Sequence, residues 1–189
     1  MQTELIGMFK PLDILDEKDK RLRAISKDAT FPLSKEEKKL IQQMIDHLTF
    51  SQIEEKAEKY NLRPGMGLAF PQLGINKRII VIVEEYEEGK FDNYVVINPV
   101  IVSNSTEIIA ADAGEGCLSV NREVEGHVPR YARVTVEGYD EDGNLIRVRA
   151  REDLSIAFQH EIDHLNGILF FDRINKEKPF FSEREIRLI

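Results

Sequence analysis

The run Gln159-His160-Glu161-Ile162-Asp163-His164 constrains the fold of this chain more than any other part of its sequence. Two histidines four residues apart lie on one face of a helix, one turn above the other. Imidazoles in that arrangement can bind one metal ion, and the adjacent Glu161 can reach a water molecule held by the metal. The run therefore predicts a helix that supports metal-assisted attack on a carbonyl, with a carboxylate handling the protons.

The residues around this run predict that the helix is buried inside a domain. Asp153 can act as its N-cap, and Gly167 lies where a helix commonly ends in a left-handed residue. The apolar residues between them cover more than one side of the helix, as expected for a helix enclosed by other elements; they are Leu154, Ile156, Ala157, Phe158, Ile162 and Leu165.

Length and composition predict one soluble globular domain that spans residues 1–189. The hydrophobic share of 42% and the charged share of 32% are typical of a folded protein and not of a disordered one. The net charge of -8 argues against a general nucleic-acid binder, so we expect no direct nucleic-acid recognition.

The sequence shows no feature of a secreted or membrane protein. The first ten residues lack the basic region and apolar run of a signal peptide, and no apolar run is long enough to span a bilayer. The single cysteine, Cys117, excludes an internal disulfide framework. We therefore expect a cytoplasmic protein without a membrane partner, whose thiol stays reduced and can serve as a ligand.

Hydrophobic periodicity predicts helices at the start of the chain and strands in its middle. Ser34 and Glu37 form a capping box for a helix that runs to about residue 49, and helical composition continues over 50–60. Strands are expected at 78–84, 94–98, 100–102, 106–110, 131–139 and 145–149, with a short final strand at 168–171. This order predicts an α+β domain in which antiparallel β-sheets pack around the central metal-binding helix.

A catalytic site of the zinc type needs a third protein ligand, and Cys117 is a candidate. The site takes three protein ligands and keeps one position open. A lone cysteine is more often a small buried hydrophobic residue. Beside a His-Glu-x-x-His helix, a thiolate ligand becomes the favoured interpretation of Cys117, which lies in Gly114-Glu115-Gly116-Cys117-Leu118-Ser119.

A third segment, Gly65-Met-Gly-Leu-Ala-Phe-Pro-Gln72, has the composition of a loop that cradles a ligand. It is not a dinucleotide fingerprint, because Phe70 stands in place of the third glycine and no strand precedes it. A simple turn between a helix and a strand is an equally open interpretation. Gln72 is a candidate for catalysis because an amide can donate to an oxyanion without adding charge.

These three segments, in this order, resemble the three signature motifs of the peptide deformylases, at 65–72, 115–119 and 159–164. The similarity extends over most of the chain. The segments at 30–34 and 128–134, with the insert after Ser119, resemble the longer form typical of Gram-positive bacteria. One departure is Phe70, where the family usually has alanine, and we expect this side chain to narrow or reshape the loop.

The resemblance implies a hydrolase that removes the formyl group from the N-terminal formyl-methionine of newly synthesised proteins. Glu161 would accept a proton from the attacking water and pass it to the departing amine. The backbone N–H of Leu118 and the amide of Gln72 would stabilise the oxyanion. The implied metal ligands are Cys117, His160 and His164.

The resemblance also implies how a substrate and a cofactor bind. The substrate backbone would pair like an added strand with the loop formed by Gly65, Met66, Gly67 and Leu68. Candidates for an apolar methionine pocket are Met66, Leu68 and Ile156. One divalent metal ion is expected, Fe2+ in cells, with Zn2+, Ni2+ and Co2+ as substitutes. The protein would be a monomer that acts on nascent polypeptides, and the ribosome is a candidate partner.

Two alternatives remain open at this point. A zinc-dependent peptidase would share the His-Glu-x-x-His helix and could take its third ligand from Glu183 or Glu185. A metal-binding or ribosome-associated module without catalysis is the other alternative, although a purely structural site has no use for Glu161.

Two further hypotheses concern single residues. Arg130 could pair with Asp163 and so hold the metal-binding helix in place, or the two could be independent surface residues. His47 and His127 are expected to be ordinary surface histidines.

Overall fold

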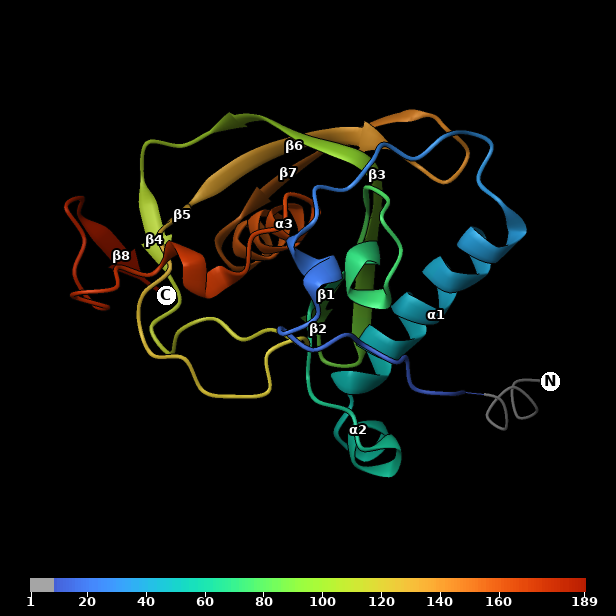
Figure 1. Cartoon of the computed structure of the whole chain (residues 1–189), viewed down its shortest axis with the longest axis horizontal. Coiled ribbons are helices and arrows are strands. Elements are labelled where there is room, and N and C mark those ends of the chain that lie inside the picture. The colour runs from blue at the N-terminus through green and yellow to red at the C-terminus, as the bar shows by residue number, and fades with distance from the viewer. Residues whose placement is uncertain (1–8) are drawn as a thin grey trace.

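The two histidines lie on one helix, α3 (Glu152–Leu165), and the remaining elements enclose it. In the computed structural model, which describes residues 9–189, every residue from Leu154 to Leu165 is buried. Figure 1 shows α3 beneath the arch of the long strands. The expectation of no signal peptide concerns residues 1–10, most of which lie outside the described part of the chain.

Two β-sheets surround this helix. Neighbouring strands of the larger, antiparallel sheet follow the order β1 (Gly67–Ala69), β2 (Ile79–Glu87), β3 (Lys90–Asn104), β6 (Arg133–Tyr139) and β7 (Leu145–Arg151). In the smaller sheet, β4 (Ile108–Ala110) pairs antiparallel with β5 (Arg130–Tyr131) and parallel with β8 (Ile186–Leu188). The expected α+β fold, with antiparallel sheets around the metal-binding helix, is confirmed.

The N-terminal helices form as the sequence predicts. Helix α1 (Lys35–Ser51) begins with the capping box, in which the Glu37 N–H donates to Ser34 Oγ and the Ser34 N–H to the Glu37 carboxylate. A short break separates it from α2 (Glu54–Tyr60). Among the described residues, no helix combines the length and apolarity that a membrane span requires.

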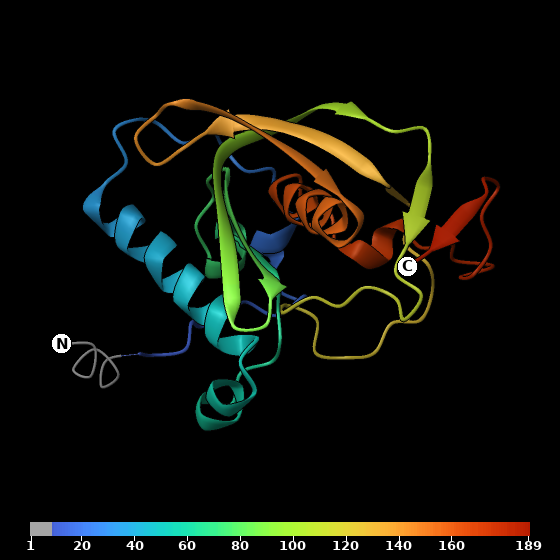
Figure 2. The same ribbon diagram turned by 180° about the vertical axis from the view of Figure 1, so that it is seen from behind.

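The sheet around β1 and β2 is covered on both faces. Alternate residues of β2 contribute to two apolar cores, one shared with α3 and the other with α1. Figure 2 shows α1 and α3 on opposite sides of these strands. Burial on both faces explains why the segment from Ile79 to Val83 is continuously apolar and does not alternate.

Several elements differ from the sequence prediction. Strand β3 does not end at Pro99 but continues through it, because the register shifts between Ile97 and Val100 and a bulge accommodates the proline. The predicted final strand at 168–171 is wrong, since a 3-10 helix, η4 (Phe170–Arg173), follows α3 there. Asp153 is not the N-cap of α3 but lies in its first turn, where a carboxylate complements the helix dipole.

His47 is not a surface residue, in contrast to the prediction. Its side chain is buried on α1, and its Nδ1 accepts a hydrogen bond from the Leu12 N–H at 3.1 Å. Burial lowers the pKa of His47, which favours the neutral ring that this hydrogen bond requires. His127 is partly exposed and contacts Phe180 edge-on.

Phe70 does not narrow the loop that carries it. It opens a 3-10 helix, η3 (Phe70–Leu73), and its side chain is fully buried in the core shared by α1 and β2. It is not among the residues that line the cleft between β1 and α3. The expected narrowing of the loop by Phe70 is therefore not seen, because this side chain packs into the core.

We expect Phe70→Ala to destabilise the protein by about 3–5 kcal/mol, since it leaves a cavity in a closely packed core. For a chain of this size, thermal unfolding should shift down by roughly 2–4 °C per kcal/mol. Calorimetry checks this. A melting temperature equal to that of the wild type would mean that Phe70 is not packed as described.

Candidate active site

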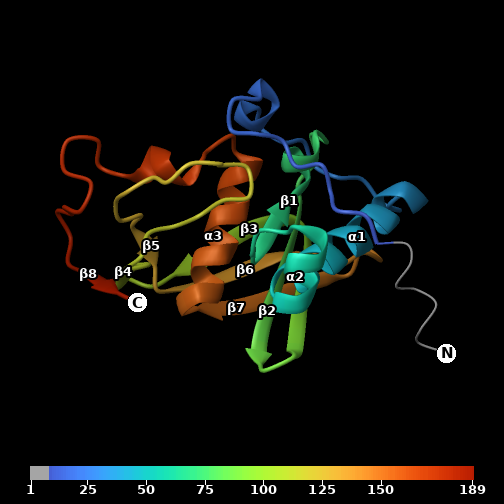
Figure 3. The ribbon, with the colours of Figure 1, turned by 90° about the horizontal axis from the view of Figure 1, so that it is seen from below.

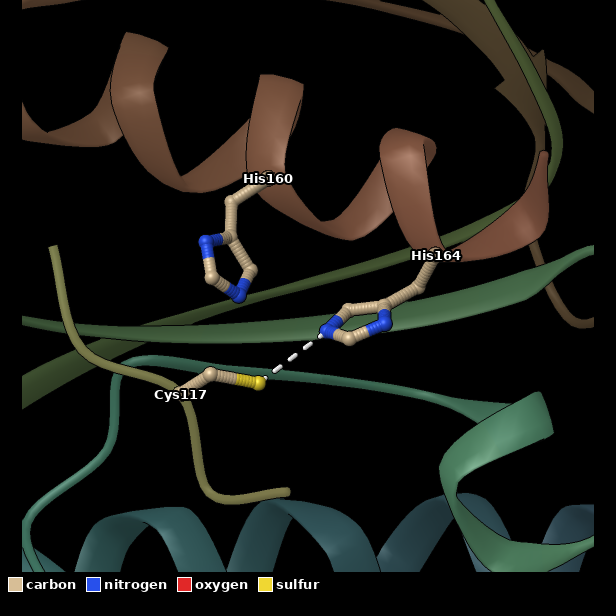
Figure 4. Close-up of side chains that lie close together, drawn as sticks. All are labelled: Cys117, His160 and His164. Atoms are coloured by element: carbon tan, nitrogen blue, oxygen red, sulfur yellow. Dashed lines mark hydrogen bonds between the residues drawn. The ribbon is translucent and has the colours of Figure 1, made fainter. Parts of the chain in front are cut away.

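Cys117, His160 and His164 converge beside α3 (Figure 4). One ligand atom from each residue lies within 4.8 Å of the others, and Cys117 Sγ is 3.3 Å from His164 Nε2. Both histidines are buried, and Cys117 is partly exposed. The structure thus brings together, in one cluster, the three residues that the sequence proposes as ligands.

Two different kinds of backbone supply these ligands. Helix α3 holds His160 and His164 one turn apart, as the spacing predicts. Cys117 comes from residues 111–129, which contain no helix or strand and run alongside α3 (Figure 3). The position of Cys117 therefore depends on contacts that this loop makes with the rest of the protein.

Glu115 anchors the loop and orients His160. The Glu115 carboxylate lies 2.9 Å from His160 Nδ1, and since it only accepts hydrogen bonds, Nδ1 carries the proton and Nε2 is free to bind a metal. Arg130 donates two hydrogen bonds to the same carboxylate, at 2.7 and 2.9 Å. Burial alone would raise the pKa of Glu115, but the bonds from Arg130 and His160 outweigh burial and hold the pKa at about 2.

Arg130 also binds the helix itself. It donates to the Asp163 carboxylate at 2.6 Å, so the proposed pair of Arg130 and Asp163 is confirmed, and it is buried. The partly exposed Arg173 makes two more bonds to Asp163, both at 2.6 Å. Two arginines thus neutralise the two carboxylates, which satisfies the requirement for pairing of buried charges.

The chemistry of the cluster fits a divalent transition metal. A thiolate with two imidazoles is a donor set suited to zinc, iron, cobalt and nickel. Burial alone would lower the pKa of His160, but the hydrogen bonds that its ring donates to Cys117 and Glu115 outweigh burial and raise this pKa well above its ordinary value, whereas burial lowers the pKa of His164. A ligand must lose its proton to bind, so metal affinity at this site should increase with pH.

Glu161 lies next to the cluster with unused hydrogen-bonding capacity. It is buried, and within the described residues its Oε2 has no hydrogen-bond partner. Burial raises the pKa of Glu161 to about 7, which suits a group that exchanges protons near neutral pH. A Cβ added at Gly67 would lie 2.5 Å from Glu161 Oε1, so the glycine gives this carboxylate room beside β1.

Gln72 and Leu118 also lie at the cluster. The buried Gln72 amide is fixed at both ends, because its Oε1 accepts from the Ala69 N–H at 2.9 Å and its Nε2 donates to Ser119 Oγ at 3.1 Å. Its Nε2 lies 3.7 Å from Cys117 Sγ. In the described part of the chain, the Leu118 N–H donates to no protein acceptor.

A cleft of about 1170 Å³ opens in front of these groups. Its lining includes Gly65, Met66 and Gly67 on one wall and Ile156 on another. Strand β1 is at the edge of the sheet, and among residues 9–189 it pairs with no strand other than β2, so its other edge carries no strand there. Leu68 is an exception among the candidate pocket residues, since its side chain is fully buried in the core and does not line the cleft.

Glu183 and Glu185 do not lie in this cleft. Both are exposed, and Glu183 lines a separate hollow on the other side of α3, next to Arg173. Among residues 9–189, the one cluster of potential metal ligands is formed by Cys117, His160 and His164. The arrangement therefore offers no third ligand of the kind that a zinc peptidase would take from this region.

Sequence reasoning missed two residues that organise the site. Glu115 lies in the quoted motif, but its role as the partner of His160 depends on a fold that brings residues 45 positions apart together. Arg63 precedes the glycine loop and donates to three carbonyls of the Cys117 loop. No local pattern marks either residue, apart from their position next to motif residues.

Comparisons with known proteins agree with this geometry. The sequence profile of the polypeptide deformylase family matches residues 11–180. A peptide deformylase of Listeria monocytogenes is 48% identical over 92% of this chain and 95% of its own length. A plant peptide deformylase structure is 30% identical, with a TM-score of 0.73, over 90% of this chain and 84% of that one. A peptide deformylase structure from Acinetobacter baumannii with bound Met-Ala-Ser is 27% identical, with a TM-score of 0.70, over 88% of this chain and 100% of that one.

We expect Glu115→Gln to weaken metal binding by about 10- to 100-fold, since the amide holds the His160 ring less firmly than a carboxylate does. Competition with a chelator measures this affinity. Glu107→Gln is the matched control, because Glu107 binds two arginines at the surface and has no contact with the cluster. Equal affinities for the two variants would contradict the role assigned to Glu115.

Proposed function

The chain belongs to the polypeptide deformylase family, and on this premise we propose that Cys117, His160 and His164 hold the metal with which it removes N-formyl groups. The substrate is the formyl-methionine at the start of newly synthesised proteins, and the products are formate and a free amino terminus. The convergence of these three side chains beside the buried Glu161 is the observation that carries the proposal.

The donor set accommodates the metal that the family uses. When bound, a divalent cation supplies Lewis-acid polarisation of a carbonyl and makes water more acidic. We propose Fe2+ as the ion in cells, with Zn2+, Ni2+ and Co2+ as substitutes, since a thiolate and two imidazoles suit all four.

Glu161 is the proposed general base and acid. It accepts a proton from the water whose oxygen forms the new bond to the formyl carbon. As the carbon–nitrogen bond breaks, the same carboxyl passes that proton to the departing amine, which leaves as the methionine amino group. Since no hydrogen-bond partner of Glu161 Oε2 is found among residues 9–189, this oxygen is available for both transfers.

The proposed oxyanion donors are the Leu118 N–H and the Gln72 amide. Negative charge develops on the formyl oxygen as water adds, and fixed donors stabilise that charge without having to reorganise. Gln72 is held in place by Ala69 and Ser119. Loss of one such donor typically raises the barrier by about 3 kcal/mol.

The free edge of β1 is the proposed binding site for the substrate backbone. Backbone pairing along Gly65, Met66, Gly67 and Leu68 is independent of side-chain identity, which suits an enzyme that accepts many N-termini. Met66 and Ile156 line the cleft and are the proposed contacts for the methionine side chain. The tripeptide Met-Ala-Ser bound to the Acinetobacter baumannii relative has the chemistry of such a product.

We further propose a monomer in which residues 1–189 form one catalytic domain, located in the cytoplasm where nascent polypeptides are made. The ribosome is a candidate partner, because it presents the substrate. The shared length with the Listeria monocytogenes relative supports a single catalytic unit.

Glu161→Gln should lower kcat for formate release from a formyl-Met peptide by roughly 10²- to 10⁴-fold, because it removes the proton-transfer group. Metal content should stay at the wild-type level, since Glu161 is not a proposed ligand. Formate detection and metal analysis on the same preparation check both points. Unchanged formate release would rule out this role for Glu161.

Cys117→Ser should lose most of its bound metal on dialysis, because a neutral hydroxyl replaces a thiolate ligand. Glu183→Gln should retain the metal and full activity. Elemental analysis of the two variants separates the deformylase site from a peptidase site. If Glu183→Gln lost the metal and Cys117→Ser kept it, the peptidase interpretation would be correct.

A further inference from the structure

The Cys117 loop, residues 111–129, is anchored on both sides of the cysteine. Before Cys117, Glu115 binds Arg130 and His160. After Cys117, the backbone carbonyls of the loop need partners, since residues 111–129 form no helix or strand. The Glu17 N–H binds Ser119 O at 2.7 Å, and Arg63, which no strand or helix includes, binds the carbonyls on either side of it.

The guanidinium of Arg63 binds three carbonyls of the loop. Its Nη2 donates to Cys117 O at 3.1 Å and to Leu118 O at 2.6 Å, and its Nη1 donates to Val120 O at 3.0 Å. Five N–H donors in one rigid plane suit this arrangement, whereas a lysine offers a single nitrogen. Hydrogen bonds from a charged donor are also stronger than those between neutral groups.

One of these contacts, that to Cys117 O, acts on the peptide unit of the proposed oxyanion donor. Cys117 O and the Leu118 N–H belong to the same peptide unit, which is planar. Arg63 Nη2 and the Val120 N–H, which donates to the same oxygen at 3.0 Å, therefore together set where the Leu118 N–H points. Donation to the carbonyl in addition polarises the peptide unit and strengthens its N–H as a donor.

The backbone next to Arg63 is itself held by hydrogen bonds. Two residues later, the Gly65 N–H donates to Ser51 Oγ at 3.2 Å, and Gln52 Nε2 donates to Gly65 O at 3.1 Å. A Cβ added at Gly65 would lie 2.7 Å from the Leu118 side chain, so the two walls of the cleft touch at this point. Arg63 thus links the wall that would bind the peptide to the wall that carries the metal ligand.

We propose that Arg63 is a positioning residue, which aligns the Leu118 N–H with the reacting carbonyl by fixing the Cys117–Leu118 peptide unit. This inference rests on the proposed function. Arg63 is exposed, and no carboxylate among the described residues forms an ion pair with it. Its contribution to overall stability is therefore small, and the effect of its removal should be confined to the loop.

The test compares Arg63→Met and Arg63→Lys with the wild type, all loaded with zinc. Arg149→Met is the matched control, because Arg149 is an exposed arginine on β7 that has no contact with the loop. For Arg63→Met, kcat for formate release should fall about tenfold with KM nearly unchanged. This decrease in kcat is smaller than the decrease expected when an oxyanion donor is removed altogether. Arg63→Lys should lie between Arg63→Met and the wild type.

Nitrogen-15 relaxation gives a readout that does not depend on activity. The order parameter of the Leu118 amide should fall from a rigid value of about 0.85 towards 0.6 in Arg63→Met. Amides of α3 should keep their values, and the melting temperature should stay within about 2 °C of the wild type, as expected for an exposed side chain.

Three results would overturn the inference: an unchanged Leu118 order parameter, an unchanged kcat in Arg63→Met, or a loss of order spread over the whole chain. The last would indicate a purely structural role. If the wild type itself released no formate, the proposed function would be wrong, and the Leu118 order parameter alone would then decide whether Arg63 holds the loop.

Discussion

The buried ion pairs of Arg130 hold the site together. One guanidinium binds a carboxylate from the loop, Glu115, and a carboxylate from α3, Asp163, and so joins the irregular part of the chain to its most buried helix. Buried pairs of this kind add little net stability, but removal of one partner leaves an uncompensated charge and is strongly destabilising. The arrangement therefore fixes the position of the loop more than it adds to the stability of the fold.

Close packing around the cleft also fixes the positions of side chains in the site. A side chain would not fit at Gly65 or Gly67, since Leu118 and Glu161 occupy the space next to these glycines. The groups that would carry out the chemistry are thus held by direct contact with the backbone of β1 and the turn before it. Apolar cores on both faces of the β1–β2 sheet keep that backbone in place.

Sequence reasoning works here where chemistry and spacing depend on the local chain. The spacing of His160 and His164 predicts the helix and its metal-binding face, and the strand patterns predict most of the sheet. Sequence reasoning fails where the placement of a side chain depends on which face of a short segment is buried. The sequence predicts Leu68 in the methionine pocket and a loop narrowed or reshaped by Phe70, but both side chains pack into the core. Glu115 was missed as an organising residue because its partners are distant in sequence.

The free edge of β1 also exposes the protein to unwanted association. An unpaired strand edge is a template for any extended chain, including a second copy of the same protein or an aggregate. Strand β1 is only three residues long, and its edge faces a cleft walled by α3 and the Cys117 loop. Covering a sheet edge with a helix or a loop is one way in which proteins limit pairing with the edge of another sheet. The walls that form the cleft thus also protect the protein against aggregation.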